Sequence, residues 1–375
     1  MAEPLKSQYG SEIPKTIAQR ISKVYPGFLG TEFLNTVLDG YAELELMQRA
    51  KKITVGMREY LPGDYREAIS ILMNSLGERL TKTERNGMST FLYLPHCMFV
   101  SDYGLNHFEL SMSALYELTQ RFTAEFSIRV FLETYPDETL NRLRQWAADP
   151  SEHVRRLVSE GTRPRLPWAS RLPEFQKDPT RPLELLELLK DDESEYVRRS
   201  VANHLNDIGK DHKDILLFVA TRWMKEATPK RKALVRHALR SLVKQGDSKA
   251  LELLGYQNDL TISVTNCWVK PDFILLGESV CFGFDLHNQS PQPVRVMVDF
   301  VVHFQKANHK TNSKVFKLKA TELPGKATVS FEKVVKFVTL TTRIHYPGLH
   351  RIEILVNGAL YQVGEFTLKS MQPKY

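Results

Sequence analysis

One short stretch of the chain gathers three kinds of side chain that could together handle positive charge beside a polyanion. DPSEHVRRLVSEGTRPRLPWASRL, from Asp149 to Leu172, contains five arginines, two glutamates and one tryptophan. Fixed carboxylates stabilise a developing cation or orient water, an aromatic face attracts a cation, and guanidinium groups pair with phosphates. Pro164 and Pro167 stiffen the backbone around the tryptophan. The stretch therefore predicts a functional site.

Part of this stretch recurs along the chain. SEHVRRLVSE, which begins at Ser151, matches SEYVRRSVAN, which begins at Ser194, with a period of 43 residues. LTQRFTAE from Leu118 aligns more loosely one unit earlier, and ALVRHALR from Ala233 follows one unit later. A period near forty with two helices per unit is typical of HEAT-like arrays, which stack into a curved solenoid with a concave face.

Each unit carries an arginine and, four residues later, a second polar or charged residue. Residues four apart share a helix face, so we expect these pairs to form one stripe on the solenoid. Only two members of the stripe are acidic, and they occupy adjacent units. The pairs are Arg121 and Glu125, Arg156 and Glu160, Arg199 and Asn203, and Arg236 and Arg240.

A plainer interpretation of these residues stays open. An Arg–Glu pair four residues apart is most often a solvated surface pair that contributes about a few tenths of a kcal/mol. A lone tryptophan such as Trp168 is more often a core residue than a site residue. However, Arg163, Arg165 and Arg171 flank Trp168, and such neighbours are unfavourable for a purely structural ring.

Basic residues at helix starts and inter-unit loops indicate a groove that follows phosphates. In the helical part the predicted DNA-contacting residues of the stripe and loops are Arg121, Arg155, Arg156, Arg163, Arg165, Arg199 and Asn203. Near the C-terminus, QKANHKTNSKVFKLK places Lys306, Lys310 and Lys314 around a predicted hairpin tip, where they could also contact DNA. An edge strand kept soluble by lysines is an equally good interpretation of those three residues.

The chain has two parts that differ in the spacing of their apolar residues. Apolar residues recur at helical spacing from about Thr31 to Leu253, which predicts an all-α, HEAT-like solenoid over residues 1–255. After Gly255, seven short segments alternate in polarity or are β-branched, and Asn357–Gly358 is a hairpin pair. Residues 256–375 are therefore predicted to form an all-β, immunoglobulin-like sandwich that assists DNA binding, although the Cys…Trp…Cys signature is missing.

The composition favours an acidic partner. The 375 residues carry a net charge of +7 and a pI of about 9.1, which favours nucleic acid first and a membrane surface second. Three cysteines are too few for a disulfide framework and lack metal-ligand spacing, so a cytoplasmic location and no metal are expected. No signal peptide, membrane span, phosphate-binding glycine loop or nucleophile elbow is recognised, and His96 and His204 are interpreted as packing or hydrogen-bonding residues.

Three segments resemble one family closely. TAEFSIRVFLETYP, DPSEHVRRLVSEGTRPRLPW and YVRRSVANHLNDIGKDHKD resemble motifs of the AlkC-type DNA alkylation-repair glycosylases, members of the HEAT-like superfamily that also contains AlkD. The resemblance starts near Thr31 and extends into the strand-rich part, since such proteins can carry an immunoglobulin-like domain there. Val130 departs from the family pattern, in which proline is common at this position.

The resemblance implies an activity and its residues. Such enzymes hydrolyse the N-glycosidic bond of cationic bases, chiefly 3-methyladenine and 3-methylcytosine, in duplex DNA. They are monofunctional, need no metal or cofactor, and act without base flipping. By motif position, Glu125 and Glu160 would be the catalytic carboxylates and Trp168 their aromatic partner. Arg156 and Arg163 would hold the DNA backbone, and Arg129 would support the site and its DNA contact.

The chemistry suits these residues. A base alkylated at N3 is already cationic, so it departs neutral without a general acid, and two carboxylates can stabilise the sugar cation and position water. Two alternatives stay open: a HEAT scaffold that binds DNA or protein without cutting, and a glycosylase with an AlkD-like preference for bulkier or 7-alkylated bases. A monomer acting on double-stranded alkylated DNA, with no membrane partner, is the expectation.

Overall fold

The computed structural model describes residues 5–80, 89–256, 261–308, 310–339 and 344–369. The chain divides into two compact units. The first contains residues 1–216 and 227–238, and the second contains residues 217–226 and 239–375. The change from helix to strand lies between α16 (Ser248–Leu253) and β1 (Ile262–Lys270), so the last helices group with the strands rather than with the solenoid.

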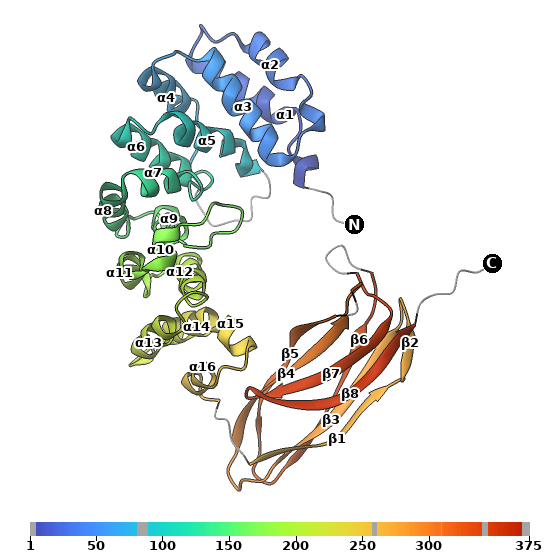
Figure 1. Cartoon of the computed structure of the whole chain (residues 1–375). Coiled ribbons are helices and arrows are strands. Elements are labelled where there is room, and N and C mark those ends of the chain that lie inside the picture. The colour runs from blue at the N-terminus through green and yellow to red at the C-terminus, as the bar shows by residue number, and fades with distance from the viewer. Residues whose placement is uncertain (1–4, 81–88, 257–260, 309, 340–343, 370–375) are drawn as a thin grey trace, which may run out of the picture. The chain divides into compact units, whose positions relative to one another are not determined.

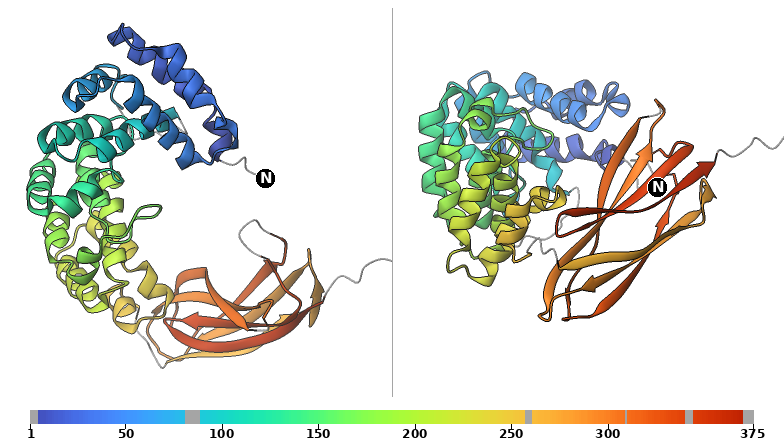
Figure 2. Two further views of the ribbon diagram at one scale, coloured as in Figure 1. Left: turned by 45° about the horizontal axis from the view of Figure 1, so that its top comes forward. Right: turned by 60° about the horizontal axis from the view of Figure 1, so that its bottom comes forward.

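The first unit is built of helices that follow one another in a curved stack (Figures 1 and 2). Their apolar faces pack inward; in α4, for example, Ala68, Ile69 and Leu72 are buried. Its α-helices are α1 (Glu12–Val24), α2 (Gly30–Leu38), α3 (Leu46–Tyr60), α4 (Tyr65–Asn74), α5 (Leu94–Tyr103), α6 (Phe108–Thr119), α7 (Ile128–Thr134), α8 (Pro136–Trp146), α9 (Glu152–Gly161), α10 (Pro173–Lys177), α11 (Thr180–Leu189), α12 (Glu195–Ile208) and α14 (Pro229–Ala238). Its 3-10 helices are η1 (Leu5–Gln8), η2 (Tyr41–Glu43) and η3 (Ser89–Tyr93).

The repeated sequence forms equivalent helices that pack side by side, α9 and α12. Each begins after a serine in an extended conformation, Ser151 or Ser194, whose backbone N–H donates to an aspartate two residues earlier. These serines end the preceding turn and set the start of each helix. α12 packs in turn against α14, so α9, α12 and α14 form three successive layers of the stack.

The first arginine of each repeated VRR triplet holds its own helix start. Arg155 donates to the carbonyls of Asp149 and Pro150, while Arg198 donates to those of Asp192 and Glu193. Arg155 also pairs with the Asp192 carboxylate, 2.6 Å away, which joins the two repeats. Arg155 and Arg198 therefore have a structural role at these helix starts. The second arginine of each triplet, Arg156 or Arg199, is left to make other contacts.

The second unit contains the strands and the helices α15 (Arg240–Lys244) and α16, while α13 (Lys213–Met224) spans the division. All seven predicted strand segments are confirmed, and the structure adds the three-residue β2, which was too short to recognise. The remaining strands are β2 (Phe273–Leu275), β3 (Ser279–Asn288), β4 (Val294–Gln305), β5 (Thr311–Leu323), β6 (Thr328–Lys336), β7 (Gly348–Val356) and β8 (Ala359–Lys369).

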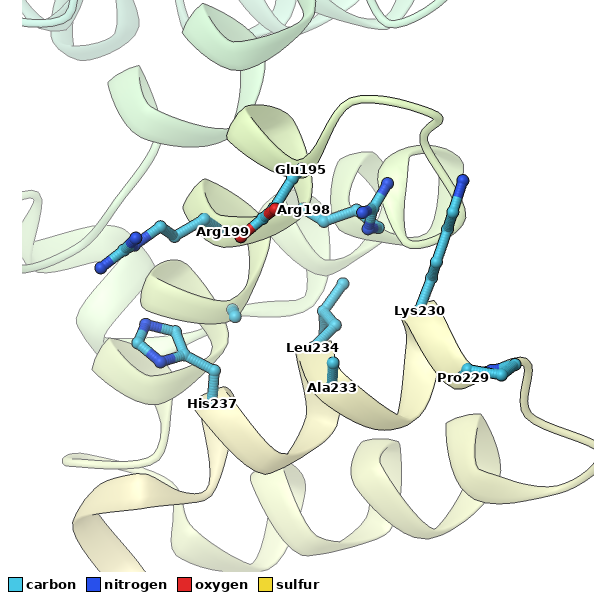
Figure 3. A pocket seen from close by; sticks show the side chains of 9 residues that line it. Glu195, Arg198, Arg199, Pro229, Lys230, Ala233, Leu234 and His237 are labelled. Carbon is cyan, nitrogen blue, oxygen red and sulfur yellow. The ribbon is translucent and has the colours of Figure 1, made fainter. Parts of the chain in front are cut away.

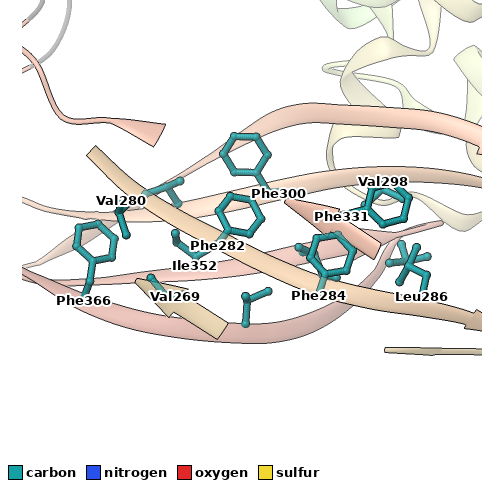
Figure 4. Close-up of a cluster of buried hydrophobic side chains, with 14 of the residues drawn as sticks. Val269, Val280, Phe282, Phe284, Leu286, Val298, Phe300, Phe331, Ile352 and Phe366 are labelled. Carbon is teal, nitrogen blue, oxygen red and sulfur yellow. The ribbon is translucent and has the colours of Figure 1, made fainter. Parts of the chain in front are cut away.

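The strands form two sheets, ordered β1-β3-β6 and β2-β8-β7-β4-β5. Asn357 and Gly358 both have positive φ, 47° and 86°, and join β7 to β8, which confirms the predicted hairpin. The core contains the rings of Phe282, Phe284 and Phe300 (Figure 4). Cys267 and Cys281 are free thiols, so apolar packing holds this sandwich without a disulfide between them.

Among the described residues, no helix combines the length and apolar character needed to cross a membrane. His96 and His204 are buried, and His204 Nδ1 is also hydrogen-bonded to the carbonyl of Ser159, which agrees with their interpretation as packing or hydrogen-bonding residues. Burial lowers the pKa of each ring to about 4. Both rings are therefore neutral near pH 7.

Candidate active site

The two predicted carboxylates and the predicted aromatic residue line the same cavity. This cavity, of about 410 Å³, lies in the first unit and contains Glu125, Glu160 and Trp168 among its lining residues. Much of the remaining lining is apolar, including Phe91, Phe122 and several other rings and aliphatic chains. Glu125 lies 35 positions before Glu160 and 43 before Trp168 in the sequence, and the helical stack brings the three residues together.

One guanidinium connects the two carboxylates. Arg156 Nη1 lies 2.6 Å from Glu125 Oε2, and Arg156 Nη2 lies 3.7 Å from Glu160 Oε1. The Arg156 guanidinium also stacks over the ring of Tyr196, 5.0 Å from its centroid. Burial lowers the pKa of Arg156, but the two glutamates outweigh this and the net pKa is raised. Arg156 thus stays cationic and holds both acids at one point.

Glu160 is held ionised although it is only 6% exposed. Its Oε1 accepts from Arg163 Nη1 at 2.5 Å, and its Oε2 accepts from the hydroxyl of Ser200 at 2.6 Å. Burial raises the pKa of Glu160, but the charges of Arg156 and Arg163 and the two hydrogen bonds outweigh burial, so the pKa falls below its ordinary value. Both oxygens of this carboxylate are occupied and its position is fixed.

Glu125 is held differently. It is 8% exposed, and its Oε2 accepts from the Thr123 hydroxyl at 2.7 Å as well as pairing with Arg156. Within the described part of the chain, no hydrogen bond reaches its other oxygen, Oε1. One oxygen of Glu125 therefore remains available to a water molecule in the cavity.

Trp168 lies in the loop between α9 and α10. Its side chain is 76% exposed and its φ is 65°, a left-handed conformation that is uncommon outside glycine. The interpretation of Trp168 as a core residue is therefore wrong. An exposed ring held in an unfavourable backbone conformation at the mouth of a cavity suits contact with a ligand.

Arg129 holds this loop in place through hydrogen bonds to its backbone. Its guanidinium donates to the carbonyls of Gly161, Arg163 and Ser170 at 3.0, 2.8 and 2.6 Å. The residue is 1% exposed, and burial lowers its pKa to about 10. Its predicted support of the site agrees with this geometry. The prediction that Arg129 contacts DNA is corrected, because its guanidinium is buried and already donates to carbonyls of the loop.

Other arginines predicted to contact phosphates are already paired inside the protein. Arg163 is buried between Glu160 and Asp207, whose Oδ2 lies 2.7 Å from Arg163 Nη2. Arg155 is buried against Asp192, as described above. The prediction that Arg155 and Arg163 contact phosphates directly is corrected, because both guanidinium groups are buried and already paired with carboxylates. Arg165 pairs with Asp211 but keeps about a quarter of its side chain exposed.

The predicted stripe is regular only in its middle. Arg121 and Glu125 do not share a helix, because α6 ends at Thr119 and Glu125 lies in the turn before α7. Arg121 instead donates to the carbonyl of Gly77 and pairs with Glu117. Arg236 and Arg240 are also on different helices, since α14 ends at Ala238. The pairs on α9 and α12 follow the predicted spacing.

Several residues at the site escaped the sequence interpretation. Ser200, which bonds to Glu160, occupies the repeat position at which the preceding unit has Leu157. A polar residue replacing an apolar one at a buried repeat position is the signal that could have identified it. Tyr196 and Thr123 complete the contacts of Arg156, and their residue types alone give no such signal.

The predicted lysines of the second unit lie around one end of the β4–β5 hairpin. Lys306 and Lys310 are exposed and their backbones pair across the turn, with Lys306 N donating to Lys310 O at 2.8 Å. Lys314 is exposed on β5, with its ammonium 5.5 Å from the centre of the Phe316 ring. β5 is an edge strand, so the solubilising interpretation fits this geometry as well as DNA contact does.

Comparison with known proteins shows the class to which the two parts of this chain belong. Residues 121–242 match the model of the DNA alkylation repair enzyme family, and residues 263–370 match the C-terminal Ig-like domain of the YhaZ protein. The first match contains both glutamates and Trp168. The chain thus combines a DNA alkylation repair domain in its helical part with an Ig-like domain in its strand-rich part.

Two relatives extend over almost the whole chain. The structure of Pseudomonas fluorescens alkylpurine DNA glycosylase AlkC, bound to DNA containing an abasic site analog, is 38% identical with a TM-score of 0.90, covering 99% of this chain and 100% of that one. The Bacillus subtilis (strain 168) protein named "Uncharacterized protein YhaZ" is 39% identical over 355 residues, covering 94% of this chain and 96% of that one. The chain belongs to the AlkC-type family of DNA alkylation repair enzymes.

Proposed function

We propose that this protein is a DNA glycosylase that hydrolyses the N-glycosidic bond of cationic alkylated bases in duplex DNA, 3-methyladenine and 3-methylcytosine in particular. The observation that carries the proposal is the convergence of Glu125 and Glu160 on one guanidinium, in a cavity shared with the exposed Trp168. Family membership and the similarity to the Pseudomonas fluorescens alkylpurine DNA glycosylase support the reaction class.

The two carboxylates divide the work in this proposal. Glu160, with both oxygens bonded, supplies a fixed negative charge that stabilises the oxocarbenium ion developing on the sugar. Glu125 uses its available oxygen to orient water, or to accept its proton, for attack on that sugar. The cationic base leaves as a neutral molecule, so the reaction needs no general acid and leaves an abasic site in an uncut strand.

The aromatic ring contributes at the mouth of the cavity. Trp168 attracts the cationic base or sugar through its face, worth on the order of 1–2 kcal/mol once desolvated. Because the ring is 76% exposed, it can meet the lesion at the duplex surface. We therefore propose that the base is not extruded into an enclosed pocket, unlike the usual arrangement in glycosylases.

A scaffold that only bound DNA or protein would gain nothing from this arrangement. Burying two carboxylates costs free energy unless they are paired, and their charge repels the phosphates of a polyanion. A catalytic site gains from the same charge because it acts on a developing cation. The buried pair thus favours an enzyme over the scaffold. We further propose a cytoplasmic monomer that acts on double-stranded alkylated DNA without cofactor, metal or membrane.

The test is excision from methylated duplex DNA with identification of the released bases. Glu160→Gln is expected to lower single-turnover excision of 3-methyladenine by about 100-fold or more, in line with the loss of a preorganised electrostatic group, while duplex affinity stays close to that of the parent. Glu125→Gln should lower the same rate.

Glu174→Gln is the matched control, because Glu174 is an exposed glutamate outside the cavity. Unchanged excision by Glu160→Gln would remove that residue from the mechanism. If the protein itself released no base, the scaffold would be the better interpretation. Release of 7-methylguanine in place of 3-methyladenine would indicate an AlkD-like lesion preference.

A further inference from the structure

Helix α12 contributes side chains to two cavities of the first unit. A basic cavity of about 570 Å³ lies between α12 and α14, where Glu195 and Arg199 project from α12 (Figure 3). Arg199 is exposed and has no ion pair or hydrogen bond with the described residues, which agrees with its predicted contact with DNA. Tyr196, the residue after Glu195, lines the candidate active site instead. A different face of α12 thus belongs to the site of the two glutamates.

This face of α12 contacts the arginine and the acid of α9. The ring centre of Tyr196 lies 5.0 Å from the guanidinium of Arg156, and the hydroxyl of Ser200 donates to Glu160 at 2.6 Å. Tyr196 and Ser200 are four residues apart, and so are Arg156 and Glu160, so each pair shares one helix face. The preceding repeat has His153 at the position of Tyr196. The packing of α12 on α9 therefore brings a phenol into the active-site cavity.

The hydroxyl of Tyr196 is a neutral group without a bonded partner. Burial raises the pKa of this phenol; the charge of Arg156 lowers it, but Glu125 and Glu160 raise it, and the net pKa is raised. In the part of the chain that the structure describes, no hydrogen bond reaches the hydroxyl. The group is thus protonated at neutral pH and can both donate and accept a hydrogen bond.

Few side chains of this cavity are left to accept a hydrogen bond from water. Both oxygens of Glu160 are bonded, and the Thr123 hydroxyl donates to Glu125 and accepts from an arginine. In the described part of the lining, the side-chain acceptors that remain are Glu125 Oε1 and the hydroxyls of Tyr196 and Thr90. A bound water requires two or more polar partners.

Tyr196 is the acceptor that shares a neighbour with Glu125. Both contact the Arg156 guanidinium, with Glu125 Oε2 2.6 Å from Nη1 and the Tyr196 ring packed over the same group. Thr90 lies in η3, and among the residues that the structure describes no hydrogen bond ties it to Arg156. Glu125 and Tyr196 are therefore the two acceptors that one guanidinium holds together.

We propose that the Tyr196 hydroxyl is a further catalytic group, which holds the attacking water together with Glu125. The water donates one hydrogen to Glu125 Oε1 and the other to the Tyr196 hydroxyl oxygen, so that its lone pair faces the sugar. As the bond from C1′ to the base breaks, its electron pair leaves with the base, the water oxygen bonds to C1′, and Glu125 takes the proton. This inference rests on the proposed function and adds to it the group that selects water.

Tyr196→Phe tests the hydroxyl because it keeps the ring over Arg156. Excision of 3-methyladenine is measured under single-turnover conditions in buffer that contains methanol, and mass spectrometry of the strand gives the ratio of methyl glycoside to abasic sugar. Water can donate to both acceptors, whereas methanol has only one hydrogen to donate. Loss of the hydroxyl should therefore raise this ratio by about 3-fold or more and slow hydrolysis by about 3- to 10-fold, in line with one neutral hydrogen bond.

Thr90→Val and Tyr135→Phe are the matched controls. The first removes the other open hydroxyl of the cavity, and the second removes a phenolic hydroxyl outside the cavity. Both are expected to keep the ratio of the unsubstituted protein. A raised ratio for Thr90→Val with an unchanged ratio for Tyr196→Phe would overturn the assignment to Tyr196. Slower excision by Tyr196→Phe at an unchanged ratio would show a packing role and would overturn it as well.

Base release by the unsubstituted protein separates this inference from the proposed function. If no base is released, the glycosylase proposal and the role of Tyr196 fail together. If 3-methyladenine is released and Tyr196→Phe keeps the ratio of the unsubstituted protein, only the role of Tyr196 fails. Release of 3-methyladenine with a ratio raised in Tyr196→Phe alone supports both.

Discussion

Glu160 owes its charge to three neighbours that come from different parts of the sequence. Arg156 and Arg163 lie on or just after its own helix, whereas Ser200 reaches it from the next repeat. Asp207 holds Arg163 from the other side, with Asp207 Oδ2 accepting from Arg163 Nε at 2.8 Å. A carboxylate in this setting stays ionised below its ordinary pKa of 4.5, so it is ready to stabilise a cation at neutral pH.

Ser200→Ala tests this network at the residue scale. The hydrogen bond from Ser200 lowers the pKa of Glu160, so its loss should raise that pKa. Because the ionised form is the active one, the acid limb of the excision pH profile should move to higher pH. A hydrogen bond to a charged group contributes about 1.5–3 kcal/mol, so we expect about 10-fold slower excision near pH 7.

Ser200→Thr keeps the hydroxyl and is expected to recover most of the rate. A role of Ser200 limited to packing predicts a changed stability with an unmoved acid limb. That result would contradict the positioning role, and so would an acid limb that moved to lower pH.

At the scale of the element, the position of Glu160 depends on how closely α9 approaches α7. Gly161, the last residue of α9, lies where an added Cβ would be 2.6 Å from the Cγ2 atom of Ile128. Its carbonyl also accepts from Arg129, which holds the loop that carries Trp168. The absence of a side chain at residue 161 thus sets the position of the carboxylate and of the aromatic loop together.

Gly161→Ala is expected to push the end of α9 away from α7. Overpacking a well-packed contact typically costs about 1–3 kcal/mol of unfolding free energy, and excision should fall because Glu160 moves with the helix end. Gly63→Ala is the control, since an added Cβ there has no neighbour within 4 Å. Denaturant unfolding and single-turnover excision check the pair; equal stabilities and rates would show that the contact relaxes without effect.

At the scale of the whole molecule, the two compact units present different groups that could contact DNA. The helical unit has a cavity with acids and an aromatic ring, and a second, basic cavity. The strand unit presents lysines at one end of the β4–β5 hairpin. We propose that these lysines assist DNA binding, so that the strand unit contributes affinity and the helical unit contributes the chemistry.

Lys306→Ala/Lys310→Ala/Lys314→Ala in the full chain tests the contribution of the strand unit. If all three ammonium groups contact phosphates, the salt slope of duplex binding should fall by about 2.7, from about 0.9 per contact. Lys326→Ala/Lys333→Ala/Lys336→Ala, on and next to β6, removes equal charge from the other sheet. Identical slopes for the two triple variants would leave the edge lysines a solubilising role only.

Local pattern was sufficient to predict much of this protein. Hydrophobic periodicity separated the helical part from the strand-rich part, and alternation predicted the seven longer strands. The repeated decapeptide located α9 and α12 and ends at Glu160, and the proline-containing loop that follows it pointed to Trp168. These predictions succeed because periodicity and turn chemistry act over a few residues, and a sequence records them directly.

Only the tertiary structure decided which side chains are available. Arg155 and Arg156 are neighbours in sequence, yet one caps its own helix and the other bridges two glutamates. Asp192, Asp207 and loop carbonyls occupy three of the predicted phosphate contacts, namely Arg155, Arg163 and Arg129. Arg199 is left open, since its repeat unit has Asn203 where the preceding unit has Glu160. Such contacts join residues about 30 to 45 positions apart, and charge compensation in a buried site depends on distance in space, not on distance along the chain.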